Sequence, residues 1–189
     1  MKDDQLERYA RHIILKEIGG AGQQRLLDAH VGLIGAGGIG APAIQYLAAA
    51  GVGRLTVIDD DVVSLSNLQR QVLFATGDIG TRKVEAAATA VARMNPDVQV
   101  NSVARRLDAD NAAALLSGVD VLLDGSDNFA TRLITADAAS ELKIPLVSAA
   151  VPQAAIRQRL PRRPRLFRIA TLKWDQNSSP AFILLIQLR

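Results

Sequence analysis

The hydrophobic positions in this chain follow two patterns, short apolar runs and longer stretches with helical spacing. The runs predict buried strands at residues 31–34, 55–59, 120–124 and 145–148, and an alternating segment predicts a further strand at residues 98–103. The stretches between them predict helices at residues 81–94, 110–116 and 129–142, and an Ala-rich helix follows the first run. Strands that alternate with helices favour an α/β fold with a doubly wound, mainly parallel sheet.

The N-terminal residues have a separate pattern. Residues 3–17 carry Leu6, Tyr9 and Ile13 at helical spacing, which predicts an amphipathic helix. The glycines at residues 19–22 predict a break, followed by a short helix at residues 23–29. We therefore expect residues 1–29 to form a helical arm ahead of the sheet.

A glycine loop follows the first predicted strand. It has the sequence G-A-G-G-I-G, and its glycines are Gly35, Gly37, Gly38 and Gly40. Such glycines let the backbone approach a phosphate, whose charge the N-terminus of the next helix favours. Pro42 suits the first turn of that helix and Gly51 suits its end. The loop predicts a nucleotide site, although the motif alone also fits a tight turn without a ligand or a dinucleotide-dependent oxidoreductase.

Two polar segments follow the second predicted strand. Asp59, at its end, can accept hydrogen bonds from ribose hydroxyls, and Asp61 remains available for a nearby cationic side chain or loop. Residues 64–71, S-L-S-N-L-Q-R-Q, then supply amide and guanidinium donors. Arg70 suits bidentate binding of phosphate oxygens, and Asn67 adds a neutral donor. The alternative for this segment is a capped polar loop.

Further candidates lie near two later helices. Lys83 begins the helix at residues 81–94 and can place an ammonium group against a triphosphate, although solvated helix lysines are common. Asp127, in the sequence S-D-N after a buried strand, has the carboxylate chemistry that Mg²⁺ prefers. The alternative for S-D-N is a helix cap. His12 and His30 are isolated, and we expect structural or solvent-facing roles for them.

Several motifs occur together in one order: R-Y-A-R-H at residues 8–12, G-A-G-G-I-G, D-D-D, S-N-L-Q-R-Q, the lysine of T-R-K-V-E, and S-D-N. In this respect residues 5–151 resemble the MoeB/ThiF/HesA family, the bacterial relatives of ubiquitin-activating enzymes. The resemblance implies a Rossmann-like, ThiF-type nucleotide-binding domain over residues 1–151. It also implies a homodimer.

The resemblance implies an adenylyltransferase that uses ATP and Mg²⁺. The C-terminal Gly-Gly carboxylate of a ubiquitin-like sulfur-carrier protein, of the molybdopterin or thiamin type, would attack the α-phosphorus. Carried over by motif, Gly37 and Gly40 would line the nucleotide, Asp59 would bind the ribose, and Asn67, Arg70 and Lys83 would contact the phosphates. Asp127 would hold Mg²⁺, and Arg11 would reach the partner subunit's site. Gly35, Gly38 and Asp61 complete the set of candidate nucleotide-binding residues. A dehydrogenase offers no joint role for Arg70 and Lys83, whereas a non-catalytic remnant that still binds nucleotide or dimerises stays open.

The amino-acid composition excludes several classes of protein and site. The sequence is 49% hydrophobic, which excludes a largely disordered chain, and it contains no apolar stretch of the ~18 residues that span a bilayer. The polar N-terminus does not resemble a signal sequence, so we predict a cytoplasmic protein without membrane contact. Because the chain has no cysteine, we expect neither structural zinc on cysteine pairs nor thiol chemistry.

The last residues differ from the rest. Of the net charge of +3, residues 1–150 carry −4 and residues 151–189 carry +7. Residues 152–189 are rich in arginine and proline and lack the interleaved aromatics that stack on nucleic-acid bases, so we predict no nucleic-acid partner. The family-like sequence stops near residue 151, and we expect residues 152–189 to be an irregular, unrelated tail after truncation or a frameshift. A lineage-specific basic extension is the alternative.

Overall fold

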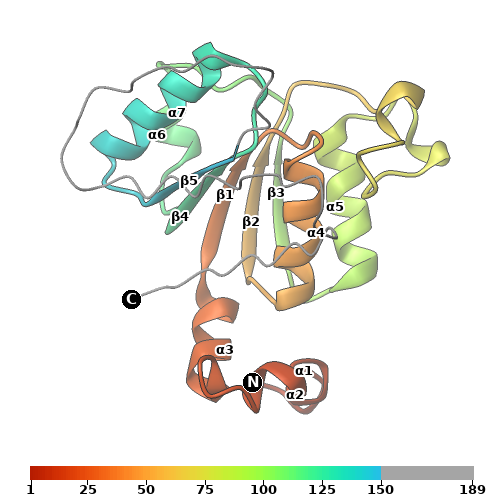
Figure 1. The fold of residues 1–189 in the computed structure, drawn as a ribbon, viewed down its shortest axis with the longest axis vertical. Helices are drawn as coiled ribbons and strands as arrows, with labels where there is room; N and C mark the ends of the chain where they lie inside the picture. Colours follow the sequence, from red (N-terminus) through yellow and green to blue (C-terminus); the bar gives the residue numbers. More distant parts are fainter. Residues whose placement is uncertain (150–189) are drawn as a thin grey trace, which may run out of the picture.

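The structure is a computed structural model that describes residues 1–149. The predictions for the basic tail and its apolar run at residues 181–186 lie outside the described residues. Two kinds of element make up the fold (Figure 1). The helices are α1 (Asp3–Arg8), α2 (Ala10–Ile13), α3 (Gly19–Asp28), α4 (Gly40–Ala50), α5 (Lys83–Met94), α6 (Ala112–Leu115) and α7 (Phe129–Glu141), with 3-10 turns η1 (Leu65–Asn67) and η2 (Thr76–Asp78). The strands are β1 (His30–Ile34), β2 (Arg54–Ile58), β3 (Gln99–Val103), β4 (Val121–Asp124) and β5 (Leu146–Ser148).

The five strands form one sheet in the order β3-β2-β1-β4-β5, and every neighbouring pair is parallel. This confirms the predicted doubly wound fold. The strand order reverses direction between β1 and β4, and at such a point two loops diverge to opposite faces of the sheet. Ligands of open α/β sheets bind in the crevice that this divergence leaves beyond the carboxyl ends of the strands.

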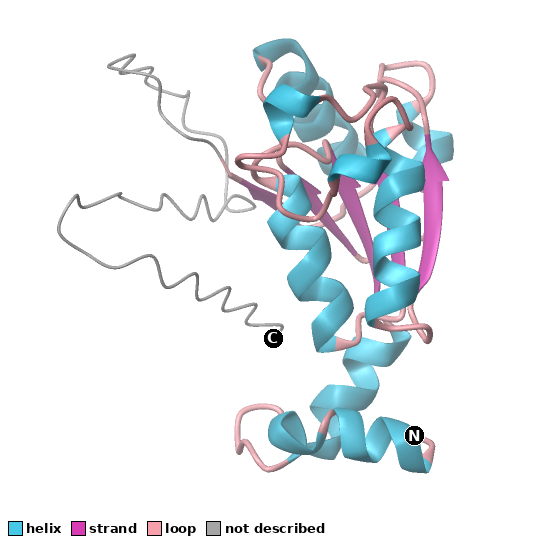
Figure 2. Cartoon of the chain, turned by 90° about the vertical axis from the view of Figure 1, so that its right-hand side faces the viewer, coloured by secondary structure: helices cyan, strands magenta, loops and turns pink. Residues whose placement is uncertain are grey.

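Helices cover both faces of the sheet. α4 and α5 pack on one face, and Figure 2 shows them side by side in front of the strands. α6 and α7 pack on the other face. Adjacent residues of β1 serve the two layers, because Leu33 joins the core beneath α4 and Ile34 joins the core beneath α6 and α7. The sheet is thus buried on both sides, which explains the short continuous apolar runs in the sequence.

The first βα unit forms as its residues predict. Pro42 lies in the first turn of α4, where a missing N–H costs nothing. Gly51 follows the helix with φ +84°, a left-handed conformation that favours glycine, and its N–H bonds to the carbonyl of Ala48. The helix therefore ends there, and the chain turns back into β2.

The N-terminal arm departs from the prediction. A single helix at residues 3–17 is wrong, because Tyr9 breaks it into α1 and α2 with φ −103° and ψ 12°. The Tyr9 side chain is 2% exposed and its hydroxyl accepts a hydrogen bond from Asn95 Nδ2 at 2.8 Å. The break predicted at residues 19–22 is also wrong, because those residues form the first turn of α3. In both places tertiary packing overrides local helix propensity.

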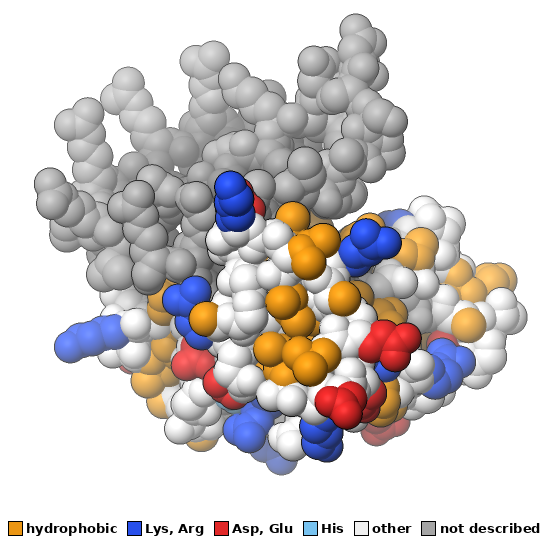
Figure 3. All heavy atoms as spheres, turned by 90° about the horizontal axis from the view of Figure 1, so that it is seen from below, with side chains coloured by type: hydrophobic (Ala, Val, Ile, Leu, Met, Phe, Trp, Pro, Cys, Tyr) orange, Lys and Arg blue, Asp and Glu red, His pale blue; other side chains and the backbone are white. Residues whose placement is uncertain are grey.

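The arm lies beyond the amino ends of the strands, at the opposite end of the sheet from the loops described next (Figure 1). Hydrophobic side chains gather in the middle of the face that it presents (Figure 3), and Leu6, Ile14 and Leu15 are among the exposed apolar residues of the arm. Within residues 1–149, no helix is both long and apolar enough to cross a membrane.

Candidate functional site

The glycine loop between β1 and α4 is tightly turned and open on its outer side. Gly35 has φ +86°, and its N–H donates to the carbonyl of Ile58 at 2.8 Å. A Cβ on Gly40 would lie 1.8 Å from the Gly35 carbonyl oxygen, so only glycine fits there. A Cβ on Gly37 would instead meet nothing closer than Gln71 Nε2, at 3.9 Å. The first and last glycines thus shape the turn, and the middle ones leave room for a ligand.

Asp59 ties this loop to the end of β2. Its Oδ2 accepts a hydrogen bond from the Ala36 N–H at 2.7 Å, and its Oδ1 accepts from the Asp61 N–H at 2.8 Å. A carboxylate has about four acceptor positions, so Asp59 retains capacity for hydroxyl donors. The predicted ribose-binding acid therefore lies directly beside the glycine loop.

Asp61 and Lys83 form an ion pair. Lys83 Nζ lies 2.8 Å from Asp61 Oδ2, and the Lys83 backbone N–H donates to the Asp61 carbonyl at 3.0 Å. The Lys83 side chain is only 5% exposed, whereas that of Asp61 is 67% exposed. The cationic partner expected for Asp61 is therefore Lys83 itself. The pairing fixes Lys83 at the start of α5 and compensates its buried charge.

The segment after β2 carries Arg70 over the glycine loop. Arg70 Nη1 donates to the Ser66 carbonyl at 3.0 Å, and the Arg70 side chain would lie 3.6 Å from a Cβ on Gly38. Asn67 closes η1, and its carbonyl accepts from the backbone N–H groups of Arg70 and Gln71. Arg70 remains exposed, so its guanidinium borders the open side of the loop.

Gln71 was not assigned a role from the sequence, although it ends the S-N-L-Q-R-Q motif. Its side chain is 2% exposed, and its Oε1 atom is buried without a hydrogen-bond partner within residues 1–149. Buried polar atoms without a partner are uncommon. The Nε2 atom of the same amide lies 3.9 Å from the Cβ position of Gly37, so the amide borders the open side of the glycine loop. The position of Gln71 within the motif was the signal that could have marked it as a candidate site residue.

The loop after β4 completes the arrangement at the carboxyl ends of the strands. Gly125 packs against the glycine loop, because a Cβ on it would lie 3.1 Å from the Gly40 nitrogen. Asn128 Oδ1 accepts from the Thr131 N–H at 2.8 Å and caps α7, as the alternative for S-D-N predicted. Asp127 is exposed, and its carboxylate accepts no hydrogen bond within the described residues. The cap and an available Asp127 carboxylate therefore coexist.

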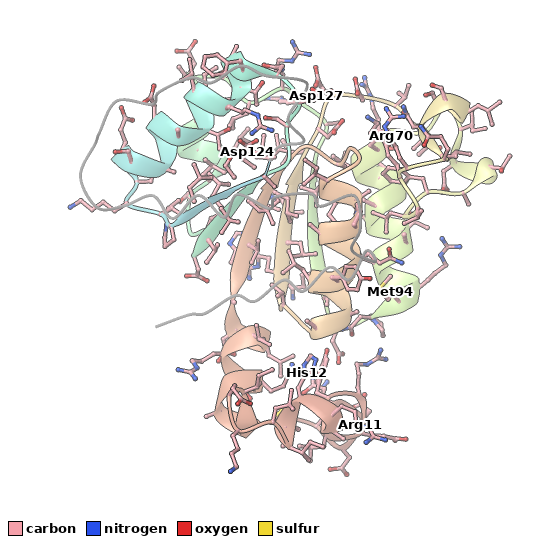
Figure 4. All side chains as sticks on the ribbon, viewed as in Figure 1. Arg11, His12, Arg70, Met94, Asp124 and Asp127 are labelled. Carbon is pink, nitrogen blue, oxygen red and sulfur yellow. The ribbon has the colours of Figure 1, made fainter. Side chains whose placement is uncertain are left out.

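Arg11 does not belong to this cluster within one chain. It lies on α2 in the arm, at the far end of the molecule from Asp127 and Arg70 (Figure 4). The neighbouring His12 has a structural contact, 2.9 Å between its Nδ1 and Gln23 Oε1. His30 also has structural contacts, with the Gly118 carbonyl and the Thr56 hydroxyl. The expectation for both histidines is confirmed.

Two further polar residues beneath the Asp127 loop were missed by sequence reasoning. Asp124 ends β4 with 1% exposure, and Arg132 approaches it from α7 at 3.9 Å. Neither stands in a motif that we recognised, and their meeting depends on how α7 packs on the sheet.

The three adjacent acids Asp59, Asp60 and Asp61 bring carboxylate oxygens within 4.8 Å of one another. Those of Asp59 and Asp61 already bind Ala36 and Lys83, so we assign no metal to that cluster.

Comparisons with known proteins agree with this geometry. The chain is 54% identical over 147 residues to the SAMP-activating enzyme E1 of Haloferax volcanii, covering 78% of this chain and 54% of that protein. It is 46% identical over 150 residues to the sulfur carrier protein adenylyltransferase of Thermus thermophilus, covering 79% and 55%. The chain thus spans about half the length of the curated relatives it matches.

A solved structure matches the fold with a TM-score of 0.74 and 30% identity, covering 78% of this chain and 60% of that one. It is the tRNA N6-threonylcarbamoyladenosine dehydratase TcdA of Escherichia coli in complex with ATP. The model of the ThiF family matches residues 9–156, which include the arm from Tyr9 onward, the glycine loop and the Asp127 loop. The chain therefore belongs to the ThiF family.

Proposed function

We propose that this chain is the nucleotide-binding part of an ATP-dependent adenylyltransferase. Its substrate would be the C-terminal Gly-Gly carboxylate of a ubiquitin-like sulfur-carrier protein. The observation that carries the proposal is the meeting of the loops that follow β1, β2 and β4, where the strand order reverses. There Arg70 lies against Gly38, and Gly125 lies against Gly40. The names of the relatives support the reaction class, and the ATP complex of TcdA supports the nucleotide.

The chain's residues fit a polyphosphate. The room above Gly37 and Gly38 admits an anion to the backbone at the start of α4, where the helix dipole favours negative charge. Arg70 can donate bidentately to phosphate oxygens, and Asn67 adds a neutral donor. Lys83 would contribute charge from a fixed position, because Asp61 holds it. Asp59 would bind the ribose hydroxyls while it holds Ala36.

Asp127 is our candidate to hold Mg²⁺, because its carboxylate is exposed and the preceding residues Gly125 and Ser126 pack against the glycine loop. When bound to triphosphate oxygens, Mg²⁺ offsets their negative charge. The cations of the chain do the same for the incoming carboxylate, which would otherwise be repelled by the phosphates. The carboxylate is ionised at neutral pH and needs no general base. Its oxygen bonds to the α-phosphorus as the bond to pyrophosphate breaks.

We also propose a homodimer in which Arg11 of one subunit reaches the site of the other. Two observations support it: Arg11 is remote from its own site (Figure 4), and the arm exposes Leu6, Ile14 and Leu15. Mixing the Arg11→Ala and Asp127→Ala variants tests this arrangement. If each variant lacks activity for the predicted reason, each mixed dimer contains one intact site out of two and regains up to about half of the wild-type activity per dimer. No recovery in confirmed mixed dimers contradicts shared sites.

The principal experiment measures exchange of labelled pyrophosphate into ATP by the full chain with Mg²⁺ and a carrier ending in Gly-Gly. We expect exchange that requires the carrier, and no exchange with a carrier that lacks its last glycine. Calorimetry with Mg·ATP is run on the same material. Binding without exchange across a panel of carriers favours the non-catalytic remnant, and absence of any ATP binding contradicts both roles. NADH serves as the control ligand for the oxidoreductase alternative, and cell fractionation checks the predicted cytoplasmic location.

A further inference from the structure

A buried polar network lies directly beneath the Asp127 loop. Arg132, in the first turn of α7, donates from Nη2 to the carbonyls of Ser126 and Ala149, the latter at 2.8 Å. Its Nη1 donates to the Ser148 hydroxyl at 3.3 Å. One guanidinium thus joins the loop after β4 to the end of β5. Figure 4 shows Asp124 below Asp127, at the same end of the sheet.

Asp124 is the centre of this network. Its Oδ1 accepts from the Ser126 N–H at 3.0 Å and from the Ser126 hydroxyl at 2.6 Å, and its Oδ2 accepts from the Ser148 hydroxyl at 2.9 Å. Because the residue is 1% exposed, its charge needs both these donors and a nearby cation, which Arg132 supplies at 3.9 Å. The oxygens of Asp124 accept three hydrogen bonds within the protein and the residue is 1% exposed, so it is not placed as a nucleotide ligand. Arg132 donates to three partners in the described chain, and we do not place it as a nucleotide ligand either.

The network instead determines where the loop stands. Ser126 is held through its N–H, its hydroxyl and its carbonyl, and Asp127 is the next residue. On the other side of Ser126, the Gly125 N–H donates to the Ile34 carbonyl at 2.9 Å and packs against Gly40. The spacing between the glycine loop and Asp127 is therefore fixed by contacts that Asp127 itself does not make.

We propose that Arg132 is a positioning residue that, through Ser126 and Asp124, holds the Asp127 carboxylate at a set distance from the glycine loop. The inference rests on the proposed function in one respect, that Asp127 acts on a Mg·nucleotide. It also links that loop to the residues that follow β5, because Ala149 shares the same guanidinium nitrogen as Ser126. Loss of Arg132 frees the Ser126 carbonyl and leaves Asp124 as a buried carboxylate without its cation.

The first test needs no activity. The chain contains no cysteine, so Asp127→Cys and, as a reference, Ile79→Cys each provide a single site for a nitroxide spin label. Ile79 is exposed in a loop that has no contact with the network. We expect Arg132→Gln to increase the mobility of the label at position 127 and to leave that at position 79 unchanged. Ser148→Ala, a milder change, covers the case in which Arg132→Gln fails to fold.

The second test measures Mg²⁺ dependence in the unlabelled protein. Outer partners of metal ligands typically change metal affinity by about 10–100-fold when removed, so we expect Arg132→Gln to raise the half-saturating Mg²⁺ in exchange by about tenfold or more. The KM for Mg·ATP at saturating Mg²⁺ should change little, and Arg132→Lys should recover part of the loss. Arg93→Gln, which removes an exposed arginine from the last turn of α5, is the charge-matched control.

The outcomes separate the two proposals. Unchanged label mobility in both Arg132→Gln and Ser148→Ala overturns the positioning role, whatever the activity. Increased label mobility with an unaltered Mg²⁺ requirement also overturns the positioning role, because the loop would then move more without any effect on the reaction. If the wild-type chain shows no exchange, the proposed function fails, and the label at position 127 still decides whether Arg132 holds the loop.

Discussion

Both ends of the sheet carry polar and charged side chains, but the two ends differ in whether those side chains have hydrogen-bond partners within the protein. At the amino end, Tyr9 is buried, its hydroxyl bonds to Asn95, and Arg8 donates to the Met94 carbonyl at 3.1 Å. At the carboxyl end, Arg70 and Asp127 are exposed, and Gln71 has a buried oxygen without a partner in the described chain. The polar groups named at the amino end form hydrogen bonds within the protein, whereas several at the carboxyl end are available to a ligand.

The glycines show the same contrast. A Cβ on Gly51 would lie 2.4 Å from the Tyr9 ring, and one on Gly53 would lie 1.8 Å from the Leu27 carbonyl oxygen. At Gly37 and Gly38 the nearest atoms to a Cβ would belong to the side chains of Gln71 and Arg70, at 3.6 Å or more. Glycine at the amino end therefore admits another part of the protein, and glycine at the carboxyl end leaves space for something else. Substitutions at the two ends should separate stability from activity.

The largest effect should come from Tyr9→Ala. Removal of a fully buried aromatic side chain leaves a cavity against Gly51 and takes away one of the two acceptors of the Asn95 amide. We expect a loss of about 3 kcal/mol or more in the free energy of unfolding. Chemical denaturation measures it, with Tyr46→Ala as the matched control, because Tyr46 is 59% exposed and should change stability by less than about 0.5 kcal/mol. Folded Tyr9→Ala protein should still bind ATP. Weakened ATP binding with unchanged stability contradicts the division between the two ends.

Asp127→Ala should have the opposite signature. We expect a fall of about 100-fold in carrier-dependent pyrophosphate exchange, since the loss of one preorganised electrostatic group has this size in other enzymes. Stability should change by less than about 0.5 kcal/mol, because the Asp127 side chain is exposed. Asp60→Ala is the matched control, as Asp60 is an exposed neighbour of Asp59 whose carboxylate pairs with Arg106, at 3.2 Å. An equal loss of exchange in both variants removes Asp127 from the site.

A smaller effect is expected from Arg70→Ala. We expect about a tenfold weaker affinity for Mg·ATP, the loss of one charge-assisted contact. Arg70→Lys should fall between the two, because an ammonium keeps the charge but not the bidentate fork. Calorimetry measures these affinities, and Arg93→Ala controls for the change in net charge. If Arg70→Ala binds Mg·ATP as tightly as the wild type, the guanidinium beside Gly38 is not a phosphate ligand.

Local signals in the sequence were sufficient to predict the sheet and the loops that meet beyond its carboxyl end. Short apolar runs predicted β1, β2, β4 and β5, and an alternating segment predicted β3. Pro42 and Gly51 predicted the start and the end of α4, and Asp59 lies next to the glycine loop. Where the outcome depended on distant residues, prediction failed. The helix predicted at residues 3–17 is interrupted at Tyr9, whose hydroxyl bonds to Asn95. Arg132 and Asp124 come together only because α7 packs on the sheet. No spacing within one segment reports a contact made across the fold.

The smallest expected effects come from two buried polar side chains, Tyr9 and Gln71. The Tyr9 hydroxyl has a hydrogen-bond partner, whereas Gln71 Oε1 has none in the described chain. Tyr9→Phe removes one partner of the Asn95 amide, which still donates to the Ala48 carbonyl, so we expect a loss of about 1 kcal/mol in unfolding free energy. Gln71→Met keeps the volume of the side chain and removes an oxygen that has no partner in the described chain, so stability should stay within about 0.5 kcal/mol of the wild type or rise. Denaturation curves give both values, and Mg·ATP affinity should fall only in Gln71→Met. A destabilisation of Gln71→Met as large as that of Tyr9→Phe, with ATP affinity intact, would mean that the Gln71 amide is bound by the protein rather than kept for a ligand.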